Sequence, residues 1–294
     1  MDLRKIIVAM VFILGFAKEK IQSQEKEIHV LFLAGQSNMA GHGDFDQLSP
    51  KIQKRIEAIK DRVLLSVSDN PKNEAKPIAP RKSKPSDKYP FTKHFGPEMG
   101  IALVLAEKNP NQKYLFIKKA VGGTSLYGAW NSNYSKEKAS FSERGMERKQ
   151  MQLYKAHHKQ IHQELQKLEQ KGIPYKIIGM AWMQGESDTN KPETANAYQG
   201  NLQLLIQGYR KEFNQPNLPF VFGQVNPLPR KFKNGPQIVR SGMERLAKDD
   251  NFIQMVETPA NLPWGDFPKH PDNLHYTHEG QLLLGTLMGT YLLK

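Results

Sequence analysis

Ser37, Asp272 and His275 have the types and the spacing that serine-dependent acyl transfer requires. Ser37 lies in LAGQSNMAG (33–41), directly behind the apolar run 28–32, while Asp272 and His275 lie in DNLH (272–275). A serine hydroxyl is a poor nucleophile unless a base takes its proton, and that base is usually a histidine that a carboxylate orients. Asp272 precedes His275 by three residues, so a turn can bring the carboxylate to the imidazole.

The tetrahedral intermediate of acyl transfer also needs N–H donors that are in place before the reaction. The backbone N–H groups of Ser37 and Gly123 and the side-chain amide of Gln184 are the candidates for this oxyanion hole. Gly123 suits the task because a residue without a Cβ lets its backbone approach a ligand closely.

These residues lie where strands of a sheet are expected to end. Apolar runs typical of buried strands occupy 28–33, 114–121, 175–183, 218–225 and 252–256. Helical patterns occupy 97–108, 147–171, 193–213, 237–249 and 278–292. The alternation predicts a parallel sheet with helices on both faces, and such sheets bind ligands at the carboxyl ends of their strands. Two polar stretches, 68–95 and 130–146, predict long surface loops.

Composition narrows the class of protein further. The chain of 294 residues can bury a full core as one large domain, which we assign to residues 25–294. The net charge is +13, but no nucleic-acid recognition motif accompanies it, so nucleic acid is not an expected partner. Cysteine is absent, which excludes disulfides, thiolate metal sites and a cysteine nucleophile. His158 and His162 lack a third ligand, so we expect no metal and no cofactor.

The N-terminal segment is typical of a secretory signal peptide. Arg4 and Lys5 precede the apolar run 6–17, and a polar stretch follows it. The run is too short for a membrane span, which needs about 20 residues. We therefore predict a signal peptide over residues 1–24, a secreted or periplasmic protein, and no stable membrane insertion after cleavage. An uncleaved membrane anchor is the alternative.

Four segments resemble the conserved blocks of the SGNH (GDSL-like) hydrolases. They are GQSNMAG (35–41), GGTSLYGAW (122–130), WMQGESD (182–188) and DNLH (272–275). They resemble more closely the branch of sialate O-acetylesterases and acetylxylan esterases, carbohydrate esterase family six, as does FGPEMGIA (95–102). The resemblance implies a flavodoxin-like three-layer α/β/α fold with a central parallel five-stranded sheet, and serine-dependent removal of O-acetyl groups from sugars.

The resemblance also implies roles for individual residues. Ser37 is the implied nucleophile, His275 the base and Gly123 an oxyanion donor. Gln184 stands where the broad superfamily has Asn, which places the same amide one methylene further out. Glu186 is an alternative to Asp272 as the acid, although the D-x-x-H spacing favours Asp272.

Three further residues are candidates for contacts with the substrate. Gln36 and Asn38 flank Ser37, and Trp130 lies in a loop from which an aromatic face could pack on a sugar ring. For Trp130, a place in the core is an equal alternative.

Three functions therefore remain open at the level of sequence. The leading hypothesis is an exported serine O-acetylesterase acting on acetylated carbohydrate, such as acetylxylan or O-acetylated sialic acid. The alternatives are an esterase for lipid or aryl esters and a non-catalytic sugar-binding module.

Overall fold

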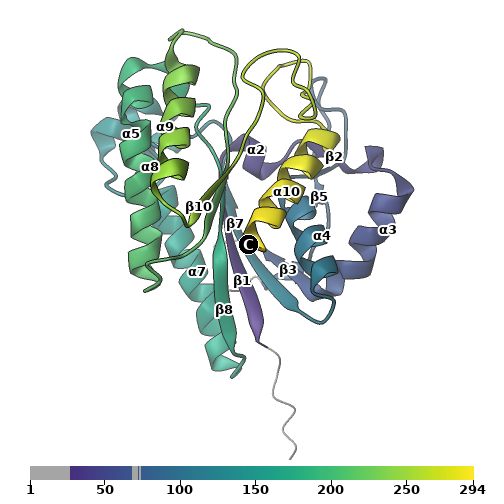
Figure 1. The fold of residues 1–294 in the computed structure, drawn as a ribbon. Helices are drawn as coiled ribbons and strands as arrows, with labels where there is room; N and C mark the ends of the chain where they lie inside the picture. Colours follow the sequence, from purple (N-terminus) through teal and green to yellow (C-terminus); the bar gives the residue numbers. More distant parts are fainter. Residues whose placement is uncertain (1–26, 68–71, 73) are drawn as a thin grey trace, which may run out of the picture.

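A computed structural model describes residues 27–67, 72 and 74–294 of the chain (Figure 1). The predicted signal peptide, 1–24, lies outside the described residues. Within the described part of the chain, no helix is long and apolar enough to cross a membrane.

A seven-stranded sheet forms the centre of the described chain (Figure 1). Its strands run in the order β10-β9-β8-β1-β7-β3-β4. Their bounds are β1 Ile28–Gly35, β3 Val63–Ser66, β4 Lys76–Pro77, β7 Lys113–Ala120, β8 Tyr175–Met183, β9 Phe220–Gly223 and β10 Ile253–Val256. All neighbours from β10 to β3 are parallel, and β4 pairs antiparallel with β3 at the edge.

The five strands expected from the sequence are all present, and the α/β class is confirmed. The sheet is wider than the five strands predicted, because β3 and β4 add to its edge beside β7. Strand β3 has only four residues and follows a helix, α3 (Pro50–Ile59), that was not predicted either.

Helices cover both faces of the sheet (Figure 1). One face carries α3, α4 (Glu98–Lys108) and α10 (His278–Leu292), and α4 packs against both of the others. The other face carries α7 (Leu153–Gln170), α8 (Pro192–Glu212) and α9 (Gly235–Asp249). The predicted helix 147–171 is interrupted at Met151 and Gln152, which separate the short α6 (Met146–Gln150) from α7.

The central strand β1 explains why the sequence predicted a buried sheet. Every residue from Val30 to Ala34 is fully buried, as expected for a strand covered by helices on both faces. Because β1 lies between β7 and β8, its carboxyl end lies beside the carboxyl ends of both.

The predicted loop 68–95 contains more structure than expected. Besides β4 it contains β5 (Arg81–Lys82) and β6 (Lys93–Phe95), which pair antiparallel as a hairpin. Strand β6 also pairs with β2 (Gly43–Asp44), which follows the segment that contains Ser37. This second, three-stranded sheet connects the hairpin to the region beside Ser37. The other predicted loop, 130–146, contains the helix α5 (Lys136–Ser142).

A buried ion pair lies under the segment that contains Ser37. Lys118 on β7 and Glu98 at the start of α4 are 2.6 Å apart, and each side chain is 1% exposed. Lys118 also donates to the carbonyl of Ala40, and Glu98 accepts from the N–H of Gly96. The pair therefore joins α4 and β7 to the end of the short helix α2 (Ser37–Ala40).

Candidate active site

The backbone at the end of β1 turns sharply so that Ser37 begins a new helix. The N–H of Gln36 donates to the carbonyl of Met183 at the end of β8. A Cβ on Gly35 would stand 2.0 Å from that same carbonyl oxygen, so only glycine allows this approach. The sequence therefore places Ser37 at the carboxyl edge of the sheet, as expected for a ligand-binding position.

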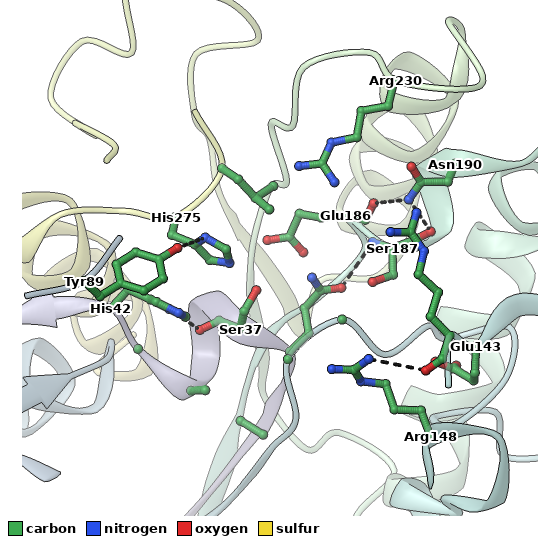
Figure 2. Close-up of a pocket in the computed structure, with 18 of the residues that line it drawn as sticks. Ser37, His42, Tyr89, Glu143, Arg148, Glu186, Ser187, Asn190, Arg230 and His275 are labelled. Carbon is green, nitrogen blue, oxygen red and sulfur yellow. Dashed lines mark hydrogen bonds between the residues drawn. The ribbon is translucent and has the colours of Figure 1, made fainter. Parts of the chain in front are cut away.

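Ser37 lines an open pocket of about 880 Å³ (Figure 2). His275, Glu186, Gly122 and Gly123 line it too. All four of the segments 35–41, 122–130, 182–188 and 272–275 thus contribute residues to one cavity.

Asp272 holds His275 through a short hydrogen bond. His275 Nδ1 lies 2.7 Å from Asp272 Oδ2, and the two side chains are 11% and 12% exposed. The other oxygen, Oδ1, accepts from the backbone N–H groups of Leu274 and His275. This fixes Asp272 within its own turn and leaves His275 Nε2 as the ring nitrogen available to the pocket.

The carboxylate of Asp272 is held in its charged form. Burial favours the protonated acid, but hydrogen bonds from His275, Lys88 and Tyr89 outweigh it and lower the pKa of Asp272 well below its usual range. A carboxylate that stays charged is suited to orient an imidazole and to stabilise the imidazolium that forms during acyl transfer.

Glu186 contacts a different residue. Its Oε1 accepts a hydrogen bond of 2.7 Å from Asn38 Nδ2, and its Oε2 is buried without a partner among the described residues. Asn38 also donates to the carbonyl of Leu274 and accepts from the N–H of Tyr276. Glu186 and Asn38 therefore connect α2 to the loop that carries His275.

Asn38 was expected to contact the substrate, and the structure does not place it there. It is 1% exposed, both ends of its amide are engaged, and it does not line the pocket. Its position is that of a structural bridge.

Trp130 is likewise absent from the pocket wall. It is fully buried, donates from Nε1 to Thr124, and packs edge-on against Trp182 at 5.2 Å. The loop 121–130 bends back into the core, so of the two alternatives for Trp130 the core position is the one observed.

Two of the three candidates for the oxyanion hole line the pocket, and the third does not. Ser37 and Gly123 line the pocket, and Gly123 has a φ of +72°, a conformation that favours glycine. Gln184 is fully buried, and its amide nitrogen donates to Asp188, to the carbonyl of Thr124 and to Gln36. The Gln184 amide is therefore directed into the protein and away from the cavity.

Gln36, and not Gln184, lines the pocket. Its Oε1 accepts from Gln184 and from the N–H of Ser187, which fixes the orientation of its amide. Of the two side-chain amides next to Ser37 in sequence, only that of Gln36 lines the pocket.

Asp188 holds the second and third sequence blocks together. Its carboxylate accepts from the N–H groups of Leu126 and Tyr127 and from Gln184. Burial raises the pKa of Asp188 to about 7, while these hydrogen bonds act in the opposite direction. The sequence showed Asp188 only as the end of the QGESD block, without a role.

His42 is a pocket residue that the sequence did not indicate. Its ring stacks on His275 at 4.1 Å, and its Nδ1 lies 3.2 Å from the carbonyl oxygen of Ser37. Burial, and to a lesser extent His275, lower the pKa of His42 to about 3, so it is neutral near pH 7. It thus contacts both the proposed base and the backbone of the proposed nucleophile.

The pocket wall is rich in positive charge. Arg144, Arg148 and Arg230 line it, and none of them has an ion-pair partner among the described residues. Figure 2 shows Arg148 and Arg230 directed into the cavity from opposite sides. The guanidinium carbon of Arg148 lies 3.6 Å from the point where a Cβ on Gly123 would stand.

Both carboxylates in the pocket wall accept hydrogen bonds from other residues of the protein. Glu143 accepts from the N–H groups of Ser125 and Ala129, and Glu186 accepts from Asn38. The cavity therefore presents unpaired guanidinium groups to a ligand. In the described part of the chain, no cluster of three or more His, Asp or Glu side chains could hold a metal ion.

A family model described as carbohydrate esterase, sialic acid-specific acetylesterase, matches residues 27–294. The chain belongs to this family. By family the protein is a carbohydrate esterase, and the resemblance identified in the sequence is confirmed.

Individual relatives agree with this assignment. A probable carbohydrate esterase of Arabidopsis thaliana is 29% identical over 117 residues, and the match spans 40% of each protein. A solved Arabidopsis thaliana protein superposes with a TM-score of 0.65 at 22% identity, covering 92% of this chain and 99% of that one. NanS superposes with a TM-score of 0.63 at 16% identity, covering 92% and 98%. At these identities the structures confirm the fold.

Proposed function

We propose that the protein is a serine O-acetylesterase that acts on carbohydrate, with Ser37 as nucleophile, His275 as general base and Asp272 as the acid that orients it. The observation that carries this proposal is the 2.7 Å contact between His275 and Asp272 in the pocket that Ser37 lines. Family membership supplies the reaction class.

The mechanism follows from this arrangement. Because Asp272 engages Nδ1 of His275, Nε2 takes the proton of Ser37 as the hydroxyl attacks the acetyl carbonyl. The N–H groups of Ser37 and Gly123 stabilise the oxyanion, and we add Gln36 as the side-chain donor in place of Gln184. The sugar alcohol leaves with the proton from His275. Water then attacks the acetyl-enzyme, again with His275 as base, and releases acetate.

For the substrate we propose an acetylated sugar that carries a carboxylate. Arg144, Arg148 and Arg230 are available to it, and guanidinium groups bind carboxylates in a bidentate manner. The description of the family, specific for sialic acid, agrees with an acidic sugar. A long-chain lipid ester is less suited to a wall with this much charge.

Measuring acetate release across a panel of esters tests the substrate class. The panel should contain O-acetylated sialic acids, acetylated xylan, a neutral aryl acetate and a long-chain aryl ester. We expect the highest kcat/KM on the acidic sugar. Equal or better hydrolysis of the long-chain ester would favour the lipid or aryl esterase, and no hydrolysis of any ester would favour a sugar-binding module.

An arginine variant tests the role of charge directly. Arg148→Gln should raise KM for the acidic sugar about tenfold, because one charge-assisted hydrogen bond is lost, and leave KM for the neutral aryl acetate within twofold. Arg62→Gln is the matched control, since Arg62 lies away from the pocket and binds the carbonyl of Ala106. An equal change on both substrates contradicts the anionic assignment.

We also propose that the protein is exported, on the basis of the signal-like segment 1–24. N-terminal sequencing of protein recovered from the periplasm or the medium should find a chain that begins near residue 25. Recovery of the uncleaved chain from the membrane fraction contradicts this.

A further inference from the structure

The β5–β6 hairpin extends to the loop that carries the proposed catalytic base. Its connecting segment, 83–92, is closed by a hydrogen bond from the N–H of Ser83 to the carbonyl of Thr92. Ser86 and Tyr89 exchange two backbone hydrogen bonds at its tip. Lys88 and Tyr89 therefore lie on a tight turn, and both reach Asp272, which is more than 180 residues later in the chain.

Three donors converge on one oxygen of Asp272. Oδ2 accepts from His275 Nδ1 at 2.7 Å, from the Tyr89 hydroxyl at 2.7 Å and from Lys88 Nζ at 2.8 Å. The Tyr89 oxygen is also 2.7 Å from His275 Nδ1. A triad requires only the first of these contacts, so the other two need their own explanation.

We propose that Lys88 and Tyr89 are positioning residues of the active site, which hold the Asp272 carboxylate against His275 and withdraw part of its negative charge. This inference rests on the proposed function, because it assigns a role to the hairpin in the reaction that Ser37, His275 and Asp272 perform.

The chemistry of each side chain suits this role. Burial and the contact with Asp272 raise the pKa of Tyr89 well above its usual range, so its hydroxyl remains a donor. Hydrogen bonds to a charged acceptor are worth roughly twice those between neutral groups. Lys88 is 55% exposed, so its effect on Asp272 is partly screened by solvent and should depend on salt.

Other groups also act on His275, and the experiment must hold them constant. His42 stacks on its ring from the segment after α2, and His270 lies on its own loop, 5.4 Å from the ring of Tyr89. Lys269, on the same loop as His275, interacts electrostatically with Glu186 and with Asp272. None of these contacts involves Lys88, and a change at Lys88 leaves them in place.

The two side chains have distinct expected effects. Tyr89→Phe removes one hydrogen bond to a charged group and should lower kcat about tenfold with KM within twofold. Lys88→Gln removes a positive charge 2.8 Å from the Asp272 carboxylate, and loss of a nearby positive charge favours the protonated form of a general base. The acid limb of the pH profile of kcat/KM should therefore move to higher pH, by roughly 0.3 to 1 unit at low salt, and the shift should shrink in 0.5 M NaCl.

Matched variants separate these effects from general damage. Lys82→Gln, on β5 of the same hairpin, makes the same change in net charge but is not part of the pocket wall. Its pH profile should match that of the wild type. Circular dichroism and thermal unfolding of each variant check the fold. In an Asp272→Asn background, Tyr89→Phe should alter kcat less than twofold, because the group on which it acts has changed.

Three results would overturn the inference. The first is a pair of variants, Tyr89→Phe and Lys88→Gln, with wild-type kcat and pH profile. The second is a rise in KM alone, which would make Tyr89 a substrate contact. The third is the same pH shift in Lys82→Gln. The proposed function itself fails by a different result, retention of activity in Ser37→Ala, so the two can be told apart.

Discussion

Asn38 donates a hydrogen bond of 2.7 Å to Glu186, and this bond separates the roles of the two carboxylates near His275. Asp272 contacts the imidazole, whereas Glu186 contacts the amide that joins the nucleophile helix to the His275 loop. One carboxylate is thus placed to orient the base, and the other to support the backbone around Ser37.

The first prediction compares conservative changes at these two positions. Asp272→Asn should lower kcat about 10⁴-fold, because the amide favours the wrong imidazole tautomer. Glu186→Gln should lower it only about 10-fold to 100-fold, because an amide keeps an oxygen acceptor for Asn38 but loses the charge. Steady-state kinetics on one acetyl ester, with circular dichroism as the folding check, measure both. If Glu186→Gln lost most of its kcat while Asp272→Asn kept nearly all of it, the acid that orients His275 would be Glu186.

The second prediction concerns the nucleophile. Ser37→Ala should lower kcat on the order of 10⁶-fold, as loss of the nucleophile does in comparable triads. The fold should survive, because no hydrogen bond of the Ser37 side chain to another described residue is lost. Activity within tenfold of the wild type would contradict the serine mechanism.

The third prediction concerns the ion pair under α2. Glu98→Gln leaves Lys118 buried without its counter-charge, and should lower the free energy of unfolding by about 3 to 5 kcal/mol. The double variant Glu98→Gln, Lys118→Met removes the stranded charge and should recover part of that loss. Urea unfolding measures each variant, and Lys113→Met on the same strand is the control because Lys113 is exposed. A double variant as unstable as Glu98→Gln alone would contradict this account.

The fourth prediction is a pH dependence of stability that Asp188 causes. Burial raises its pKa to about 7 in the folded protein, against an ordinary value of 3.8, so the folded state binds more protons between these values. The contribution of Asp188 to the free energy of unfolding is therefore fully present below about pH 4 and is lost as the pH rises to about 7.

Comparison with Asp188→Asn isolates this contribution from those of other groups. The stability of the wild type relative to the variant should fall between pH 5 and pH 7 and level off above that range. Urea unfolding at several pH values measures the difference. A difference that stays constant across this range, or one that rises with pH, is inconsistent with a raised pKa.

The sequence predicted those parts of the fold that have a clear hydrophobic pattern. The five long apolar runs are strands, and the segments behind them meet at one edge, because burial on both faces demands continuous apolar residues. Strand β3 was missed since VLLS is short and its pairing depends on β7, more than 45 residues later. Local pattern carries no information about such a partner.

The candidate site was predictable where chemistry and spacing lie within one short block. Asp272 and His275 are three residues apart, and their contact is seen as expected. Lys88 and Tyr89 could not be predicted, because they reach Asp272 only through the pairing of β5 with β6. Gln184 and Trp130 lie in sequence segments that do reach the edge of the pocket. Whether their side chains face the cavity or the core depends on tertiary packing, which the local sequence does not determine.

Strand β4 affects how readily two copies of the protein can pair through the edge of the central sheet. An exposed edge strand offers free N–H and C=O groups, on which a second chain can add a strand. Here β4 covers β3 with only two residues, Lys76 and Pro77, and both are exposed. Proline has no N–H to donate and lysine brings charge, so this edge is a poor template for intermolecular strand pairing. Its short, charged, proline-ended form should help to keep the wide sheet of this esterase from aggregating through that side.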